Sequence, residues 1–514
     1  MLAKINTFSL LGIEAIGVEA EVDISRSSLP KTTLVGLPEA AVKESIYRIE
    51  RAIENSGFSR PQDRTVINLA PAELPKQAAA LDLPMALGIL IGSQQIEIDH
   101  QFLSNYAFVG ELSLEGNTRP LKGALSIALA AAKEKGVRGI LLPSDNAPEA
   151  AVVTELEVIP IDSLSQAVGF VTEQLDLAPV PSCVETYFSA NGKHIDDFGE
   201  VRGQEMAKRA LTVAAGGGHN LLMVGPPGSG KTMLARRLPS ILPPLHPKGA
   251  IETTCIYSAL GRLAENQPLL TDRPFRSPHH TISDIGLVGG GRMPMPGEVS
   301  LSNHGVLFLD ELPEFSRRSL EVLRQPLEDK KVTISRALQS TTFPADFILV
   351  AAMNPCPCGY RNDPRRQCHC SAPQIERYMA KISGPLLDRI DIQIEVPAVA
   401  YESLANRREG TNSQTMQREV LQAQTLQRER FGKGSVLDNA HMPHRALQEH
   451  CDLDAASSEM LKKSIHQFGL SARAHAKILR VARTIADLEG SDNISTAHLS
   501  EAIHYRILDR KLWV

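Results

Sequence analysis

Residues 225–232, Gly-Pro-Pro-Gly-Ser-Gly-Lys-Thr, are the clearest candidates for chemistry in this chain. They follow the apolar segment 220–224 and precede the helical pattern 233–238, which is the context that a G-x-x-x-x-G-K-[ST] loop requires. Glycines let backbone N–H groups surround phosphates at a helix N-terminus, a lysine counters the β/γ charge, and a threonine can ligate Mg²⁺. The loop therefore predicts a site for ATP or GTP, with Mg²⁺, formed by Gly225, Pro226, Pro227, Gly228, Ser229, Gly230, Lys231 and Thr232.

Two further apolar runs end in polar side chains. Residues 305–309 end in Asp310 and Glu311, so one carboxylate can hold the metal and the second can polarise the attacking water. Residues 347–353 end at Asn354, whose amide can orient that water. Solvated strand-end acids and an asparagine capping a turn are the alternatives, but the phosphate loop favours a nucleotide-hydrolysing site.

Four of the seven cysteines, Cys356, Cys358, Cys368 and Cys370, lie within a short segment. Four thiolates this close can hold Zn²⁺ in a tetrahedral, structural site, although the C-x-C spacing also leaves an iron–sulfur cluster open. Disulfides are not expected, because the odd cysteine count without an export signal indicates a reducing compartment, the cytoplasm.

The composition is that of an ordinary globular protein, with 43% hydrophobic and 22% charged residues. The net charge of −5 means that any polyanion must be met by local basic loops. Residues 1–17 lack the features of a signal peptide, and the most apolar window, 78–91, is too short to span a membrane.

Periodicity divides the chain into an α/β domain at 1–172, a linker at 173–198, a core at 199–400 and a helical region at 401–514. The core contains buried apolar runs separated by helices or loops, which predicts a parallel sheet with its site at the carboxyl ends of the strands. No repeat with a period of about 20–50 residues is present, so repeat architectures are excluded.

The three strand ends, in this order, resemble those of AAA+ ATPases, and most closely the branch with magnesium-chelatase ATPase subunits and MCM helicases. The resemblance implies a helical C-terminal lid. It also implies that Arg389 is an arginine finger entering the neighbouring subunit's site and that Arg473 is a sensor-2 residue binding the γ-phosphate. Surface arginines, one of them paired with Asp388 and Asp391, are the alternative. A finger supplied by a neighbour implies a ring, here a homohexamer.

Two segments of the core are candidates for holding DNA. Residues 273–297, rich in Gly and Pro, resemble the helix-2 insert of this branch and offer Arg276 and Arg292. His279 and His280 in this segment are not expected to hold a metal, since no carboxylate or cysteine lies nearby in sequence at ligand spacing.

Residues 330–343 resemble the DNA-gripping hairpin of MCM helicases and offer Lys331 and Arg336, although an ordinary surface hairpin also carries such residues. Contacts to phosphates would make binding insensitive to base sequence and dependent on salt.

The N-terminal domain resembles the Lon protease catalytic domain (an S5 domain 2-like α+β fold) around residues 75–84, 108–123 and 139–143. Aligned on these segments, Ala80 and Leu125 stand where the Ser–Lys dyad would be, and Lys122 would lack a nucleophile. We therefore expect a degenerate domain without peptidase activity, which shapes the ring or contacts DNA.

Together, these segments resemble the ComM/YifB family across nearly the whole chain. The resemblance implies an ATP-dependent hexameric helicase that migrates DNA branches in homologous recombination and natural transformation. Its implied partners are single-stranded and branched DNA and recombination proteins, with no membrane involved. A chelatase-like remodeller of a protein partner is the alternative, and a Lon-like protease is the third.

Overall fold

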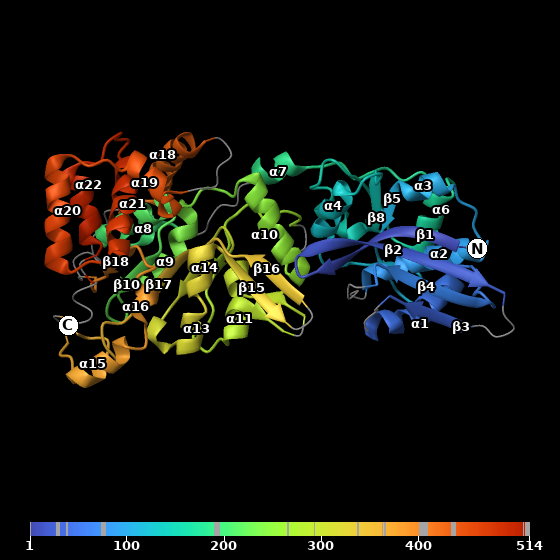
Figure 1. Cartoon of the computed structure of the whole chain (residues 1–514), viewed down its shortest axis with the longest axis horizontal. Coiled ribbons are helices and arrows are strands. Elements are labelled where there is room, and N and C mark those ends of the chain that lie inside the picture. The colour runs from blue at the N-terminus through green and yellow to red at the C-terminus, as the bar shows by residue number, and fades with distance from the viewer. Residues whose placement is uncertain are drawn as a thin grey trace. The chain divides into compact units, whose positions relative to one another are not determined.

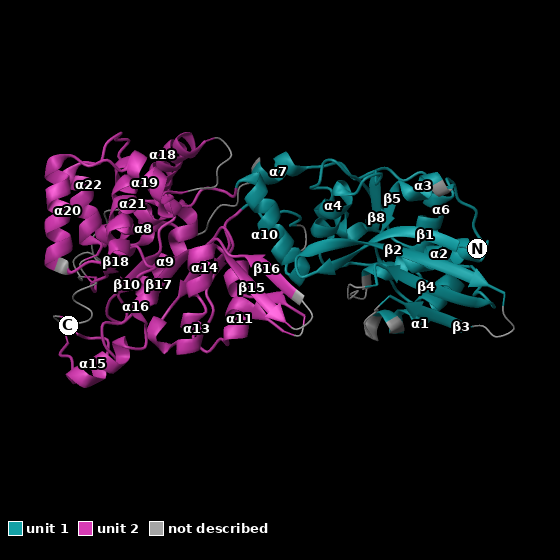
Figure 2. Cartoon of the chain, viewed as in Figure 1, with its two compact units in different colours: residues 1–191, 246–271 teal, residues 192–245, 272–514 magenta. Residues whose placement is uncertain are grey.

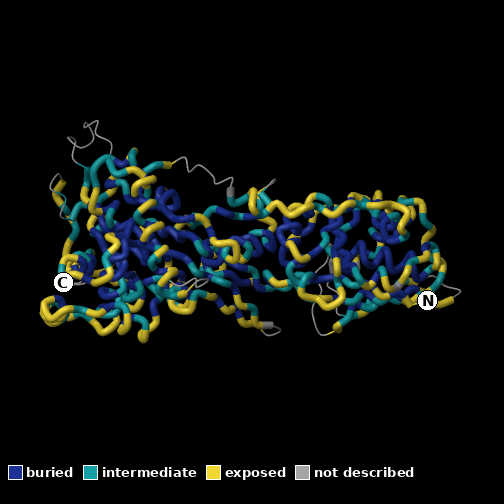
Figure 3. The backbone as a smooth tube through the Cα atoms, turned by 90° about the horizontal axis from the view of Figure 1, so that it is seen from above, coloured by how far each residue is buried: buried dark blue, intermediate teal, exposed yellow. Residues whose placement is uncertain are grey.

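The computed structural model describes residues 2–26, 31–36, 40–72, 79–189, 196–264, 267–291, 293–336, 339–361, 363, 366–399, 410–432, 438–506 and 508 (Figure 1). The chain divides into two compact units (Figure 2). Unit 1 contains residues 1–191 and 246–271, and unit 2 contains residues 192–245 and 272–514. In the tube view, buried residues lie in the interior and exposed residues lie along the outside (Figure 3).

Unit 1 is built on a mixed seven-stranded sheet. Its long first hairpin is antiparallel, whereas the strands beyond it on one side run parallel. The order across the sheet is β3 (Lys31–Val35), β4 (Arg64–Ala70), β2 (Glu14–Ser25), β1 (Leu2–Leu11), β5 (Tyr106–Phe108), β8 (Gly139–Pro143) and β9 (Glu157–Ile161).

Helices cover this sheet and complete its core. In α1 (Ala40–Asn55), Ile49, Ala52 and Ile53 are buried at helical spacing, and every residue of α2 (Asp82–Gly92) is buried. The remaining short elements are α3 (His100–Ser104), α4 (Ala124–Lys133), α5 (Ala147–Ala150), α6 (Leu164–Val171), α7 (Val184–Ser189), η1 (Ala79–Leu81), η2 (Ser144–Asn146), β6 (Glu111–Leu112) and β7 (Thr118–Arg119).

Helix α10 (Pro247–Leu260) belongs to unit 1, although it follows the phosphate loop in sequence. The hydroxyl of Ser258 donates to the buried carboxylate of Glu149. The backbone carbonyl of Ser258 accepts from the Gly123 N–H at 3.2 Å. These contacts fasten α10 to α4 and α5. The polypeptide therefore passes between the units on both sides of residues 246–271.

Unit 2 is built on a sheet of five parallel strands, as the buried apolar runs predict. Their order is β11 (Phe275–Arg276), β14 (Val306–Leu309), β17 (Ile348–Met353), β10 (Leu221–Val224) and β18 (Ile392–Glu395). Strands β10, β14 and β17 are buried throughout. The predicted mixed α/β fold with a parallel core sheet is thus confirmed.

Short helices and two hairpins connect or flank these strands. They are α8 (Glu205–Gly217), α9 (Lys231–Arg237), α11 (Asp284–Val288), α12 (Glu298–Leu301), α13 (Arg317–Glu321), α14 (Arg324–Asp329), α15 (Ala372–Met379), α16 (Gly384–Leu387), η3 (Phe198–Glu200), η4 (Leu238–Ile241), η5 (Leu312–Glu314), and the hairpins β12 (Gly289–Gly290) with β13 (Met295–Pro296) and β15 (Lys331–Arg336) with β16 (Gln339–Pro344).

The regular elements within residues 410–432 and 438–506 are all helical. Its elements are α18 (Ser413–Phe431), η6 (Asn439–His441), α19 (His444–His450), α20 (Ala455–Phe468), α21 (Ala472–Leu488) and α22 (Thr496–His504). Side chains of Asn412, Asp454, Ser471 and Ser495 cap four of these helices. Apolar residues of α18 and α21 join those of α8 in one core cluster.

No helix in the described part of the chain has the length and apolarity needed to cross a bilayer.

Candidate nucleotide site

The parallel sheet brings three polar strand ends to one edge. Strand β10 pairs with β17, and β17 pairs with β14, all in parallel register. Because parallel strands end at the same edge, the phosphate loop after β10, Asp310 after β14 and Asn354 after β17 are neighbours.

The phosphate loop turns sharply between β10 and α9. Gly228 and Gly230 have φ values of +75° and +86°, in the left-handed region that favours glycine. A Cβ at Gly225 would lie 2.2 Å from the carbonyl oxygen of Val396, so a side chain cannot be accommodated there. The backbone of the loop can therefore adopt this path only with glycine at these positions.

Lys231 opens α9 and folds over the loop that precedes it. Its Nζ donates to the carbonyl oxygens of Gly225 at 2.7 Å and Pro226 at 3.0 Å, and to Asn354 Oδ1 at 3.3 Å. Burial lowers the pKa of Lys231, while the carboxylates of Asp310 and Glu311 oppose that change. The lysine is thus a partly desolvated cation beside the loop, where a phosphate would compensate its charge.

Thr232 and Asp310 meet directly. The Thr232 hydroxyl donates to Asp310 Oδ2 at 2.6 Å, and Asp310 Oδ1 accepts from the Glu311 N–H at 2.9 Å. A hydroxyl and a carboxylate oxygen are hard ligands of the kind that Mg²⁺ uses beside nucleotide phosphates. The pair fits a nucleotide-bound Mg²⁺.

Glu311 has a histidine partner that the sequence did not reveal. Its Oε2 lies 3.2 Å from Nδ1 of His280, and its backbone is in the left-handed region with φ of +51°. The contact joins residues 31 positions apart (311 − 280), so spacing along the chain could not show it. Gln204 was also missed; its Nε2 donates to the carbonyl oxygen of Ser229 at 2.6 Å and to that of Pro397 at 3.3 Å, bracing the loop.

Arg389 and Arg473 both contact Glu328, on α14. Arg389 Nη2 lies 2.6 Å from Glu328 Oε2, and Arg473 Nη2 lies 3.6 Å from Oε1 of the same carboxylate. Arg389 forms this contact rather than a salt bridge to Asp388 or Asp391; Asp391 is buried and pairs with Lys477 at 2.8 Å. The structure therefore brings the two predicted arginines together on one residue.

The four cysteines converge as their spacing predicts. Their ligand atoms all lie within 4.8 Å of one another, and Sγ of Cys356 is 3.4 Å from that of Cys358 and 3.7 Å from that of Cys368. Four sulfurs bound to one Zn²⁺ at about 2.3 Å are about 3.8 Å apart in a tetrahedron. The donor set therefore fits a single tetrahedral Zn²⁺, and it is the one cluster of three or more potential ligands among the described residues.

The residues predicted to contact DNA differ in how far their side chains are exposed and already paired. Arg276 donates to both carboxylate oxygens of Glu298, at 2.6 and 2.9 Å, and its side chain is partly buried. Lys331 and Arg336 lie exposed at the two ends of β15. Arg292 lies outside the described residues.

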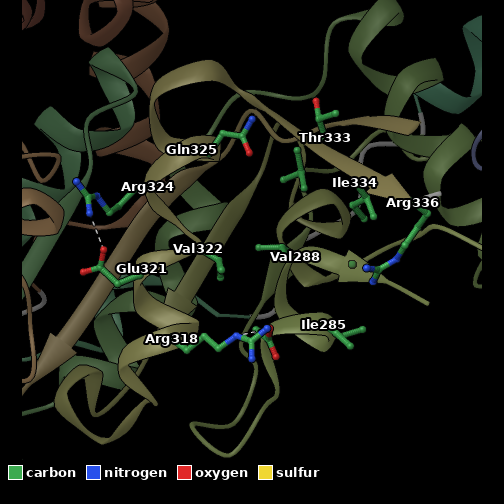
Figure 4. A pocket seen from close by; sticks show the side chains of 13 residues that line it. Ile285, Val288, Arg318, Glu321, Val322, Arg324, Gln325, Thr333, Ile334 and Arg336 are labelled. Carbon is green, nitrogen blue, oxygen red and sulfur yellow. Dashed lines mark hydrogen bonds and ion pairs between the residues drawn. The ribbon is translucent and has the colours of Figure 1, made fainter. Parts of the chain in front are cut away.

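The β15–β16 hairpin borders a hollow of about 520 Å³ (Figure 4). Apolar, polar and charged side chains line it, and each of its three arginines already has a partner. Arg336 Nε donates to the carbonyl oxygen of Gly291 at 3.2 Å, and Arg318 pairs with Asp284 at 2.9 Å. The hairpin is thus tied to the glycine-rich segment that precedes Arg292.

The dyad positions expected from the Lon resemblance carry no reactive group. Ala80 is partly exposed and its carbonyl accepts from Gly110 N–H at 2.9 Å, whereas Leu125 is fully buried and its N–H donates to Glu149. The side chain of Lys122 lies against Gly261. Residues 75–78, which precede Ala80 in the segment that resembles Lon, lie outside the described residues.

Comparison with known proteins gives matches along the whole chain. Family models of the magnesium chelatase subunit ChlI match residues 197–404 and 20–146, and a model of its C-terminal part matches residues 410–506. The Competence protein ComM of Haemophilus influenzae is 43% identical over 99% of this chain and 98% of its own length. The uncharacterized protein YifB of Salmonella typhimurium is 42% identical over the same shares. Lon protease 2 of Bacillus subtilis is 28% identical over 30% of this chain and 32% of its own length.

Proposed function

This chain belongs to the ComM/YifB family, and from that premise we propose that it is an ATP-hydrolysing DNA motor which migrates branches during homologous recombination and natural transformation. The motor is a homohexamer in the cytoplasm, acting on single-stranded and branched DNA with recombination proteins. The observation that carries the proposal is the meeting of the phosphate loop, Asp310 with Glu311, and Asn354 at one sheet edge, within a chain that resembles a competence protein over its whole length.

In this mechanism, each residue of the site has a separate role. Lys231 and the loop N–H groups bind the β- and γ-phosphates, and Thr232 with Asp310 would hold Mg²⁺, which would supply positive charge beside those phosphates. Glu311 accepts the proton of the attacking water, and Asn354, already in contact with Lys231, orients that water. His280 holds the Glu311 carboxylate before nucleotide arrives.

Turnover also requires Arg389, which we assign as the finger supplied to the neighbouring subunit. A guanidinium beside the transferred phosphoryl group stabilises its charge, and such fingers contribute about 10³–10⁵-fold to turnover in other enzymes. Arg473 of α21 is assigned to the same γ-phosphate as Arg389. Because the finger acts across a subunit boundary, hydrolysis depends on assembly.

DNA binding is assigned to the β15–β16 hairpin. Lys331 and Arg336 are exposed there, and the Gly291 contact ties the hairpin to the segment carrying Arg292. Arg276 contributes indirectly, since Glu298 already occupies its guanidinium. Contacts of this kind go to the DNA backbone, so the motor binds without regard to base sequence.

Zn²⁺ is assigned to the four cysteines as a structural ion. A metal bound by four thiolates has no open coordination position, so it would hold the fold of residues 356–370 and take no part in hydrolysis.

The proposal is tested with purified protein, ATP, Mg²⁺ and a labelled four-way junction. Lys231→Ala should abolish nucleotide turnover and branch migration. Arg336→Ala should keep the turnover measured without DNA but lose DNA stimulation and branch migration. Lys463→Ala, an exposed lysine on α20 paired at 3.6 Å with Glu459, is the matched control and should behave as the wild type. Branch migration at the wild-type rate in Arg336→Ala would exclude the hairpin assignment.

A second candidate is an ATP-driven remodeller of a protein partner, favoured by the matches to the chelatase subunit. Stimulation of ATP hydrolysis by a metal-inserting protein partner, together with no response to forked or four-way DNA, would support this candidate against the DNA motor.

A further inference from the structure

Among the residues that the structure describes, Glu328 is the one that contacts both arginines assigned to hydrolysis. It lies near the end of α14, whereas Arg389 follows α16 and Arg473 lies in the first turn of α21. Each carboxylate oxygen has one arginine, at 2.6 Å for Arg389 and 3.6 Å for Arg473. Two guanidiniums from separate elements therefore converge on one oxyanion.

The backbone under Arg389 is fixed to the sheet. Asn220 Nδ2 donates to the Arg389 carbonyl oxygen at 3.1 Å, and Asp391 Oδ2 accepts from the Asn220 N–H at 2.9 Å. Lys477, one turn after Arg473 on α21, pairs with Asp391 at 2.8 Å with both side chains nearly buried. This buried ion pair holds α21 against residues 389–391 even when Glu328 is replaced or loses its contacts.

The contacts of Glu328 are more open to water. The Glu328 side chain is 51% exposed and that of Arg473 is 61% exposed, whereas the Arg389 side chain is 11% exposed. Water can therefore compete for the carboxylate and for Arg473, which weakens these ion pairs. The hydrogen bond from Arg389, together with the charges on Arg389, Arg473 and Arg324, lowers the pKa of Glu328, so the carboxylate stays ionised. Glu328 is thus a charged but replaceable partner.

We propose that Glu328 is a positioning residue which holds Arg389 and Arg473 as a convergent pair and is displaced by the γ-phosphate on which they act. This inference rests on the proposed function, which assigns both arginines to ATP. Guanidinium groups bind carboxylate and phosphate oxygens with the same geometry, so one oxyanion can take the place of the other. Arg389 keeps its second hydrogen bond, from Nη1 to the Pro385 carbonyl oxygen at 2.6 Å, as the side chain exchanges partners.

Removing the competing charge should strengthen nucleotide binding. Glu328→Gln keeps the shape of the side chain but no longer competes with phosphate. Since one partly buried and one exposed ion pair are lost, the ATP concentration that gives half-maximal turnover should fall about two- to tenfold, with a smaller change in maximal turnover. Glu328→Asp keeps the charge and should return that concentration toward the wild-type value.

The matched control is Glu54→Gln. Glu54 lies on α1 of unit 1 and pairs with Arg51 at 2.9 Å, so its loss removes a carboxylate–arginine ion pair without touching Arg389 or Arg473. It should leave the ATP dependence unchanged. Binding of a fluorescent ATP analogue, measured on the assembled protein, provides a readout that does not depend on turnover.

Three results would overturn the inference. They are an unchanged or raised half-saturating ATP concentration in Glu328→Gln, the same shift in Glu54→Gln, and undiminished hydrolysis in Arg389→Ala. None of these measurements contains DNA. If the protein bound no DNA, the proposed motor would be refuted, but a lowered half-saturating ATP concentration in Glu328→Gln would still support the role of Glu328. If Glu328→Gln migrated branches and kept the wild-type half-saturating ATP concentration, only the role of Glu328 would be refuted.

Discussion

Replacing Gly359 by alanine should weaken ATP binding, although Gly359 lies among the cysteines and outside the phosphate loop. Its φ is +84°, and a Cβ at this position would lie 2.5 Å from Cδ and 2.7 Å from Cγ of Pro227. The same Cβ would lie 3.8 Å from Cγ of Asn354. The cysteine segment thus packs against both the loop and Asn354.

The size of the effect follows from two terms. Left-handed backbone costs a non-glycine residue about 1–2 kcal/mol. Overpacking costs about 1–3 kcal/mol, and contact at 2.5 Å cannot persist, so Pro227 or residue 359 must move. If about 1.4 kcal/mol of the second term is needed to restore the loop for nucleotide, ATP affinity falls about tenfold.

The assay is a titration with a fluorescent ATP analogue, accompanied by thermal unfolding. Gly469→Ala is the matched control, because Gly469 has φ of +63° and nothing lies within 4 Å of its added Cβ. Both variants should lose similar stability from the backbone term, but only Gly359→Ala should lose affinity. Equal affinities in the two variants would refute the reasoning.

Three further predictions concern catalysis, metal and pH. Glu311→Gln should reduce ATP turnover about 10²–10⁴-fold with ATP affinity preserved, as steady-state kinetics and binding titrations would show, because the general base is lost. Removal of metal by a chelator should release about one Zn²⁺ per chain and lower the unfolding temperature, and Cys356→Ser should show neither response; elemental analysis that finds iron instead would contradict the zinc assignment. Burial lowers the pKa of His219 from 6.5 to about 4, so the unfolded state binds this proton first as pH falls. The free energy of unfolding should therefore fall by about 2 kcal/mol from about pH 7 to about pH 5 through this group, and urea titrations of His219→Gln should show a correspondingly smaller loss.

The parts of the site that local sequence determines were the parts that could be predicted. The phosphate loop, the apolar strands and the polar residues that end them are short, contiguous patterns. Parallel pairing then requires those strand ends to share an edge, which is why Thr232 lies beside Asp310 and Lys231 beside Asn354. The cysteine cluster was equally local, since its four thiols lie within one short segment.

The remainder depends on which distant segments meet. Nothing in the sequence near Glu328 indicates that Arg389 and Arg473 approach it from two other elements, and the same holds for His280 with Glu311. The assignment of α10 to unit 1 depends on its contacts with Glu149 and Gly123. The periodic pattern of apolar residues in the sequence does not indicate these contacts. Pairings of this kind are set by the tertiary arrangement and not by local propensity.

The central claim is that energy from nucleotide hydrolysis moves DNA through contacts with its phosphates. The most direct test is the equilibrium affinity of the assembled protein, with ATP analogue and Mg²⁺, for a labelled single strand and a four-way junction over a range of salt concentrations. We predict binding at low ionic strength whose logarithm falls linearly with the logarithm of salt concentration, with a slope smaller by about one in Arg336→Ala. Turnover of nucleotide by a protein with no measurable affinity for either DNA at low salt would contradict the account.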